Sequence, residues 1–173
     1  MGSVRGVERN KAWGELAYRP LTAPWGLALE LFRFAGAWAP PSERIEAGWG
    51  AEDGGRLFAA LLAERADSFA MLHGPVVVAA PGAPPEAALD VAAGLLLAAL
   101  RHAAAEGIDT LVTRPQGMDG LFIRHGFIPV PEAELPKALR GRPGQGLLGW
   151  RGDSALWSAA GRGSARARSL SPR

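Results

Sequence analysis

His73 is the side chain whose type and place in the chain most directly suggest acid–base chemistry. It lies in an apolar segment that reads as a strand, next to the dipeptide Gly74-Pro75, and proline cannot donate to a strand ladder. A bulge or a splayed edge is therefore predicted beside His73. Because an imidazole ordinarily titrates near neutrality, His73 is a candidate base for removing a proton from an amine. The alternative is a strand histidine that only hydrogen-bonds a neighbouring loop.

A second group of polar side chains follows the predicted strand 108–113. Arg114 and Gln116 come directly after it, and ligands of α/β proteins usually bind at the carboxyl ends of strands. Arg114 is suited to pair with a phosphate or a carboxylate, and Gln116 with an amide. These two residues are the best candidates for binding substrate. Alternatively, the segment is only a turn in which Asp119 caps the next helix.

Two further segments carry polar groups of less specific character. Glu132 and Glu134 are able to supply a carboxylate base or to bind a basic substrate, but such charges are common in solvated loops and helix starts. Residues 140–146 have the glycine content of a phosphate-binding loop. Since no helix and no Lys-Ser or Lys-Thr pair follows them, a hairpin turn is the better interpretation.

The elements that must position these residues are clearest in the second half of the chain. A helix from about Pro84 to Glu106 is marked by an apolar stripe, and Gly107 after it suits a C-cap. A short helix is expected to stop at Gly126. The other predicted elements are strands 68–80 and 108–113, helix 118–125, and strands 127–130 and 146–150. This order requires at least one parallel strand pair joined by a crossover, so it predicts an α/β (α+β) fold.

The first half is harder to interpret from its pattern. Residues 14–19 alternate as a short strand, and 25–38 fit both strand and helix periods, of which helix is favoured. The glycine-rich stretch 45–55 is predicted to be a loop. Residues 56–64 are either a helix or the first arm of a hairpin that turns at 65–67. A loose arm is expected at 1–12, a folded domain at 13–150 and a flexible tail at 151–173.

Composition narrows the classes of function. The chain has 173 residues, 48% of them hydrophobic, which is enough for a core and excludes a fully disordered chain. Cysteine is absent, so a thiol nucleophile is excluded and a cytoplasmic location is expected. The net charge is only +2, and the tail alone holds five arginines against one aspartate, so nucleic-acid binding is not expected. The longest apolar stretch, 91–100, is too short to span a membrane.

The second half resembles the GNAT superfamily of N-acetyltransferases. The segment Leu121–Val130 is similar to the family's short helix, glycine stop and following strand, often written L-Y-x-x-x-G-F. Residues 94–112 are similar to its long cofactor helix and next strand, and 69–78 to its bulged strand. The match covers about residues 69–150. The resemblance implies a mixed central sheet flanked by helices, acetyl-CoA or another acyl-CoA as cofactor, and an amine of unknown identity as acceptor.

The resemblance also implies which residues hold the cofactor. The pantetheine arm would pair with the backbone of Val76, Val77 and Val78, and the pyrophosphate would bind the start of the long helix. Aligned on the family, that helix start and the short helix supply the remaining contacts, Ala88, Ala92, Ala93 and Phe122.

The chain departs from the family pattern at those places. The usual Q/R-x-x-G-x-G/A run is replaced by Ala88, Val91 and Ala93, and Asp90 adds a negative charge. Phe122 stands where many members have a tyrosine that protonates the leaving thiolate. The sequence therefore predicts an acyl-CoA-dependent N-acyltransferase, with a catalytically degenerate GNAT-fold module for binding or homodimerisation as the alternative.

Overall fold

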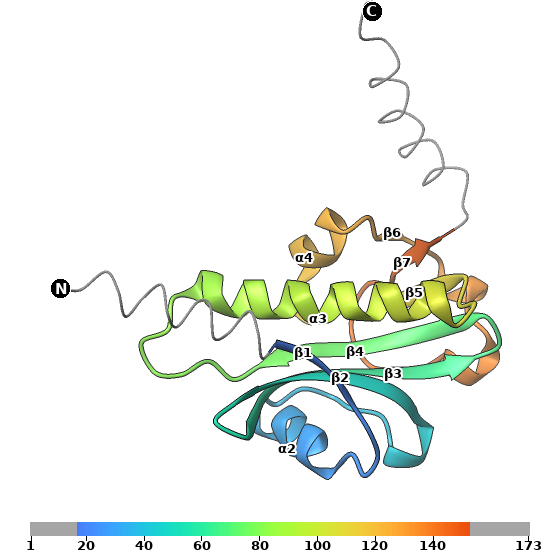
Figure 1. Ribbon diagram of the computed structural model, residues 1–173. Helices are drawn as coiled ribbons and strands as arrows, with labels where there is room; N and C mark the ends of the chain where they lie inside the picture. Colours follow the sequence, from blue (N-terminus) through green and yellow to red (C-terminus); the bar gives the residue numbers. More distant parts are fainter. Residues whose placement is uncertain (1–16, 153–173) are drawn as a thin grey trace, which may run out of the picture.

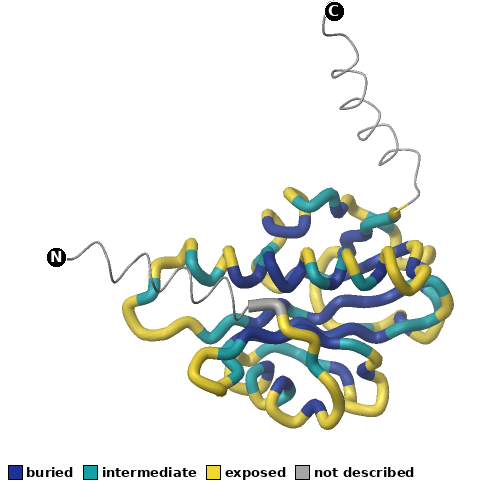
Figure 2. Tube along the Cα trace, viewed as in Figure 1, coloured by how far each residue is buried: buried dark blue, intermediate teal, exposed yellow. Residues whose placement is uncertain are grey.

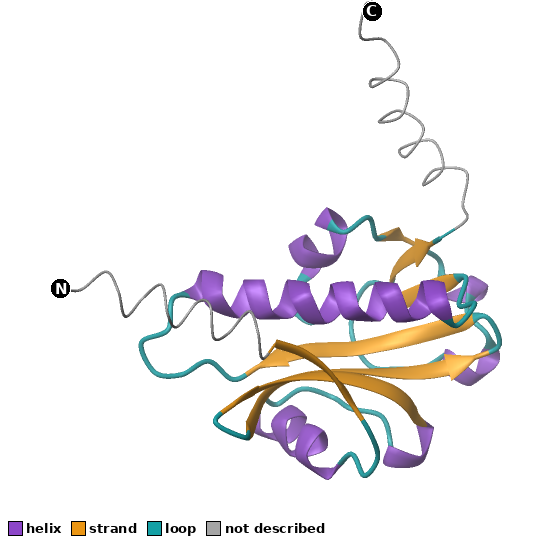
Figure 3. Ribbon diagram, in the orientation of Figure 1, coloured by secondary structure: helices purple, strands orange, loops and turns teal. Residues whose placement is uncertain are grey.

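A computed structural model describes residues 17–152 of the chain. These residues form a seven-stranded mixed sheet with the strand order β1-β2-β3-β4-β5-β7-β6. Helix α3 lies across one face of the sheet and α2 lies under the other (Figure 1, Figure 3). The α/β prediction is thus confirmed. The predicted arm 1–12 and the tail after residue 152 lie outside the described residues.

The elements follow the chain in this order: β1 Ala17–Leu21, α2 Gly26–Phe34, η1 Ser42–Arg44, β2 Ile45–Asp53, β3 Arg56–Ala66, β4 Phe69–Val77, α3 Pro85–Ala105, β5 Thr110–Thr113, α4 Asp119–Arg124, β6 Ile128–Pro129, η2 Glu132–Glu134, η3 Lys137–Leu139 and β7 Leu148–Arg151. Strands β1 to β4 are antiparallel neighbours, whereas β4 and β5 are parallel and are joined through α3. The predicted parallel pair is therefore β4–β5.

Two predictions for the first half need correction or completion. The stretch 45–55, predicted to be a loop, is the strand β2 followed by a tight turn. Its glycines serve packing, because a Cβ on Gly50 would lie 2.6 Å from Leu57 Cδ1 and 2.9 Å from Leu21 Cδ2. The ambiguous stretch 56–64 is a hairpin arm, β3. Both faces of β3 are covered, so apolar and polar residues do not alternate along its buried part, and the sequence lacks the usual pattern of a strand.

Two boundaries in the second half also differ from the prediction. Residues 140–146 are not a hairpin turn, because they connect η3 to β7, and β7 pairs with β5 and β6. The strand β7 includes Arg151, and the Gly152 N–H donates to the carbonyl of Asp109 at 3.1 Å. The last strand, predicted over 146–150, therefore spans 148–151.

Helix α3, Pro85–Ala105, agrees within one residue at each end with the helix predicted from about Pro84 to Glu106. It begins with Pro85, whose missing N–H costs nothing in a first turn, and Gly107 follows the helix with a φ of +67°. Seven of its residues are buried, four of them Ala or Gly, so the helix approaches the sheet closely. By length and composition α3 could also cross a membrane, but core helices share these properties, and α3 packs on the sheet.

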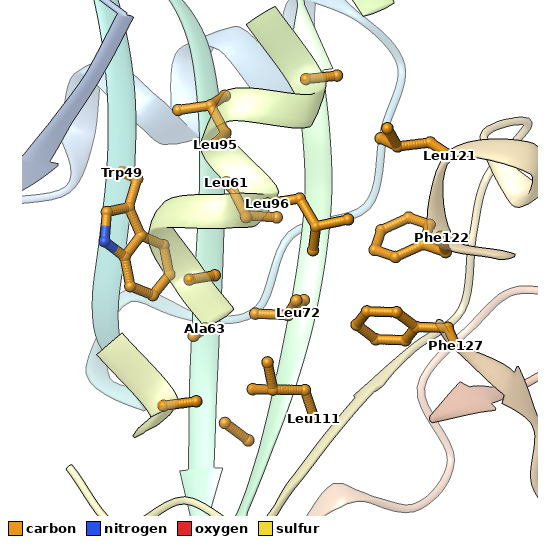
Figure 4. Packing of buried hydrophobic residues seen from close by; sticks show 14 of the residues in the cluster. Trp49, Leu61, Ala63, Leu72, Leu95, Leu96, Leu111, Leu121, Phe122 and Phe127 are labelled. Carbon is orange, nitrogen blue, oxygen red and sulfur yellow. The ribbon is translucent and has the colours of Figure 1, made fainter. Parts of the chain in front are cut away.

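The core under α3 continues to the short helix α4. The rings of Phe122 and Phe127 meet edge to face with centroids 5.1 Å apart, beside Leu72 and Leu96 (Figure 4). The opposite face of the sheet is covered by two separate groups. Helix α2 packs there through Trp25, Ala28 and Phe32, and the segment 135–147 packs against β4 and β5. The central strands are buried as a result (Figure 2).

The Phe122 site gives a direct test of this packing. Phe122 has 0% exposure, so Phe122→Ala should lower the free energy of unfolding by about 3 to 5 kcal/mol. The matched control is Ile123→Ala on the same helix, because Ile123 is 57% exposed and should change stability by less than about 0.5 kcal/mol. Urea unfolding of the three proteins, followed by tryptophan fluorescence, measures both values. Equal losses in the two variants would contradict the described packing of α4.

Candidate functional site

The candidate site is a slot that opens where β4 and β5 separate. The two strands pair from Phe69 with Thr110 up to Leu72 with Thr113. Beyond this point β5 ends, while β4 continues to Val77 beside β3. The separation begins at Gly74, one residue after His73. The predicted splaying of the two strands is therefore present in the fold.

Gly74 is held by its surroundings in a conformation that favours glycine. Its φ is +95°, and a Cβ there would lie 3.0 Å from the Val76 nitrogen and 3.1 Å from both the Ala60 oxygen and the Phe32 ring. The register between β3 and β4 also shifts here. The interruption predicted from the sequence is therefore present in β4 and is fixed by its neighbours. It turns the strand away from β5.

Residues from three parts of the chain line the slot. The hollow has a volume of about 230 Å³ and lies between the end of β4, the loop after α2 and the segment before α4. Its lining residues are Ala35, Gly36, Ala37, Gly74, Pro75, Val76, Val77, Gln116 and Met118. The fold thus brings the predicted substrate residue Gln116 together with two of the three predicted cofactor valines.

Val78, the third predicted cofactor valine, does not line this slot. Val78 lines a neighbouring hollow of about 310 Å³ beside Phe58, and its N–H already donates to the Phe58 carbonyl at 2.8 Å. Because N–H groups of successive strand residues point to opposite edges, the N–H of Val77 points away from β3 and toward the slot. Val77 is therefore the residue of this segment with a backbone donor best placed for a ligand.

The start of α3 has an electrostatic character that does not favour a phosphate. Glu86 lies in the first turn and Asp90 in the second, so two carboxylates oppose the positive end of the helix dipole. Ala88 and Ala93 are half-buried, whereas Ala92 is fully buried in the core under the helix. A ligand at this end would meet Ala88 and Ala93 before Ala92.

Phe122 does not line the slot. It is fully buried against Phe127, so its ring acts as a core residue. A tyrosine hydroxyl at this position would need a partner inside the core. Nearby, Asp119 is the first residue of α4 and makes no side-chain cap, because the N-cap position belongs to Met118. The predicted capping role of Asp119 is therefore wrong.

His73 directly precedes Gly74 on β4 but is not among the residues that line the slot, and it is part of a buried charged network. Its Nε2 is 2.7 Å from Glu64 Oε2, and its ring meets Trp38 edge to face with centroids 5.2 Å apart. Arg142 donates to both oxygens of Glu64, from Nε at 2.9 Å and from Nη2 at 2.7 Å. Glu64 is 2% exposed and His73 is 8% exposed.

Glu64 is held as a carboxylate by its two partners. Burial by itself raises the pKa of Glu64, but the hydrogen bonds from His73 and Arg142 outweigh burial and lower the pKa to about 2. Glu64 and Arg142 were not predicted as site residues. One local feature could have pointed to Glu64, because it is a charged residue at the end of an apolar run. No local feature points to Arg142, which is 78 residues away from Glu64 in the sequence.

The remaining predicted polar residues serve the loop that carries Arg142. Arg114 pairs with Glu132 and donates to the Gly146 carbonyl at 3.3 Å, so it connects both ends of this loop instead of joining Gln116 in the slot. The pair with Arg114 lowers the pKa of Glu132 below its ordinary value. Glu134 pairs with Arg151. These contacts favour the structural interpretation of Glu132 and Glu134.

The low pKa of Glu64 predicts a specific dependence of stability on pH. A carboxyl whose pKa is lowered on folding stabilises the protein above its ordinary value of 4.5, and this contribution is lost as the pH falls toward about 2. The contribution at neutral pH is on the order of 3 kcal/mol. Urea unfolding measured across this pH range should show that component in the native chain and lack it in Glu64→Gln.

Glu46→Gln is the control for this measurement. Glu46 is 56% exposed and forms a loose pair with Arg65 at 3.6 Å, so its loss should change stability by less than about 1 kcal/mol. A Glu64→Gln variant with the same pH dependence as the native chain would contradict the assigned network.

Comparisons with known proteins add the identity of the fold. No protein-family model and no curated protein matches the sequence. Solved structures do: N-acetylglutamate synthase from Neisseria gonorrhoeae, complexed with coenzyme A and N-acetylglutamate, is 19% identical with a TM-score of 0.54. The match covers 73% of this chain and 31% of the synthase, so this chain spans about a third of that protein's length.

Two further structures match along most of their own length. The ribosomal-protein-S18-alanine N-acetyltransferase from Escherichia coli is 15% identical with a TM-score of 0.57, over 80% of this chain and 94% of that one. An acetyltransferase of the GNAT family from Staphylococcus aureus is 11% identical with a TM-score of 0.57, over 78% and 99%. At these identities the likeness establishes the fold, and the chain therefore has the fold of the GNAT N-acetyltransferases.

Proposed function

We propose that this protein is an acyl-CoA-dependent N-acyltransferase that transfers an acetyl or other acyl group to an amine. The observation that carries the proposal is the slot between β4 and the segment before α4, with His73 one residue before Gly74 on the same strand. The N-acetylglutamate synthase of the same fold is complexed with coenzyme A, which supports an acyl-CoA as the ligand. A cytoplasmic location is part of the same proposal, since a chain without cysteine is compatible with a reducing compartment.

The slot residues fit the pantetheine arm of such a cofactor. The hollow of about 230 Å³ exposes backbone polar groups beside small apolar side chains, and Val77 offers a backbone N–H at its wall. Gln116 adds an amide on the other side, suited to the amides of the arm. The diphosphate end would lie toward the start of α3, where Glu86 and Asp90 weaken the attraction of the helix dipole. We therefore infer that the affinity for acyl-CoA comes mainly from contacts with its pantetheine arm.

The chemistry proposed is direct attack of the amine on the thioester carbonyl. Bringing the two reactants together supplies most of the acceleration, because a bimolecular reaction then becomes an intramolecular one. His73 receives the proton that the amine loses, within reach of Glu64. The buried Phe122 has no proton to donate to the departing thiolate, so the thiolate takes its proton from solvent or from the protonated His73.

A second candidate function is a binding or dimerisation module that retains the fold without the activity. The carboxylates at the start of α3 favour this candidate, as does the exposed apolar surface of α2. Leu27 is 70% exposed and Phe34 is 79% exposed, on the side of α2 that faces away from the sheet core. The two candidates differ in one measurable property, which is affinity for an acyl-CoA.

Isothermal titration with acetyl-CoA separates the two candidates. We expect binding, and at a hundredfold excess over Kd the ligand should stabilise the fold by about 2.7 kcal/mol. Val77→Trp should abolish binding because the indole fills the slot. Ile123→Trp, at a 57% exposed position on α4, should bind acetyl-CoA like the native chain. An absence of binding at millimolar acetyl-CoA would falsify the transferase proposal and leave the binding module.

Turnover is tested by release of free coenzyme A thiol. The chain has no cysteine, so a thiol reagent gives no background from the protein itself. The acceptors to compare are free amino acids and short peptides with a free N-terminus, since the fold's solved examples include an N-acetylglutamate synthase and an alanine N-acetyltransferase. Amine-dependent release should fall about 10²- to 10⁴-fold in His73→Ala. Unchanged release in that variant would remove His73 from the reaction.

A further inference from the structure

The network around His73 joins two parts of the chain that cover the same face of the sheet. Trp38, from the connection after α2, contacts one side of the imidazole. Glu64, from β3, holds its Nε2, and Arg142 reaches Glu64 from the loop before β7. His73 therefore lies between the two groups that cover this face.

Arg142 is fixed in place by more than its pair with Glu64. Its Nη2 donates to the Ala138 carbonyl at 2.7 Å, and its Nη1 donates to the Arg140 carbonyl at 3.0 Å. The guanidinium is thus anchored to the loop while it donates to both oxygens of Glu64. This bidentate geometry favours the ionised carboxylate, which accepts hydrogen bonds and cannot donate them.

The state of Glu64 determines which nitrogen of His73 carries the proton. The contact of 2.7 Å joins Glu64 Oε2 to His73 Nε2. Since the carboxylate only accepts, Nε2 must be the donor, and the neutral ring must therefore be the Nε2–H tautomer. In this tautomer the basic lone pair is on Nδ1.

We propose that Glu64 and Arg142 are positioning residues that fix His73 as the Nε2–H tautomer, so that Nδ1 is the atom that accepts the proton. The catalytic part of this proposal rests on the transferase function proposed above. As the amine nitrogen bonds to the acyl carbon, its proton passes to Nδ1. The C–S bond breaks, its electron pair goes to sulfur, and the thiolate then takes up a proton. The imidazolium returns its own proton to solvent or to the thiolate.

The tautomer is measured directly by long-range ¹H–¹⁵N correlation of the histidine rings, at a pH above their titration. A His73→Asn variant identifies the His73 signals among the three histidines. His125 is the internal reference, because its Nδ1 lies 2.8 Å from the Leu121 carbonyl and must donate there. We expect His73 as Nε2–H and His125 as Nδ1–H in the native protein.

Glu64→Gln should reverse the tautomer of His73. Arg142 donates to both oxygens of Glu64, and its shorter hydrogen bond is the one from Nη2 to Oε1. We expect the amide oxygen to keep that position, so the NH₂ takes the place of Oε2 and faces Nε2, which must then accept while Nδ1 carries the proton. Arg142→Lys retains a positive donor for Glu64 and should leave His73 as Nε2–H. An unchanged His125 signal in both variants verifies that the fold is intact.

Two results would overturn the proposal. One is an Nδ1–H tautomer of His73 in the native protein, and the other is a Glu64→Gln variant that keeps Nε2–H. In the thiol-release assay, Glu64→Gln should lower kcat at least tenfold with an unchanged KM for acetyl-CoA, while Arg142→Lys retains most activity. A reversed tautomer with unchanged kcat would refute the catalytic part. The tautomer measurement needs no acyl-CoA, so a failure of the transferase proposal is recognised separately by the titration with acetyl-CoA.

Discussion

The interruption of β4 at Gly74-Pro75 is the constraint on which the rest of the site depends. A proline in a central strand removes a backbone donor, and Gly74 adopts a φ of +95° that other residues avoid. As a result β4 leaves β5 after Leu72, although both strands remain in one sheet. Beyond Thr113, where β5 ends, the edge of β4 from Gly74 to Val77 therefore has no strand partner on that side among residues 17–152. A ligand that offers amide groups is the chemical complement of such an edge.

The same interruption determines the surroundings of His73. The residue before the break still belongs to the buried, paired part of β4, so its imidazole is enclosed and needs a polar partner. Glu64 provides this partner on the neighbouring strand, but a lone buried carboxylate is costly. Arg142 offsets that cost through two hydrogen bonds, and it also fastens the loop before β7 to the sheet. One network therefore serves stability, loop attachment and the orientation of the candidate base.

The start of α3 combines side chains that pack into the core with exposed carboxylates. Val91 and Ala92 lie on the buried face of α3 and belong to the core, so packing limits the size of their side chains. The carboxylates of Glu86 and Asp90 lie on the side that remains accessible. An anion at this end would meet the helix dipole and two negative charges together.

The sequence by itself determined the features that depend on local physics. The apolar period of α3, Gly107 after it and the Gly74-Pro75 interruption were all readable, because helix stripes, C-caps and proline act within a few residues. The strand β2 could not be predicted, because Gly50 is required by the close approach of Leu21 and Leu57 from the neighbouring strands. The same holds for β3, whose two covered faces remove the alternation.

Only the tertiary structure decided the composition of the site. It separated Arg114 from Gln116, placed Phe122 in the core and joined Glu64, His73 and Arg142 into one network. Glu64 and Arg142 are 78 residues apart, and their pairing depends on the folded path of the loop before β7. Local sequence carries no signal for such a contact, because its free energy comes from burial of charges that meet only after folding.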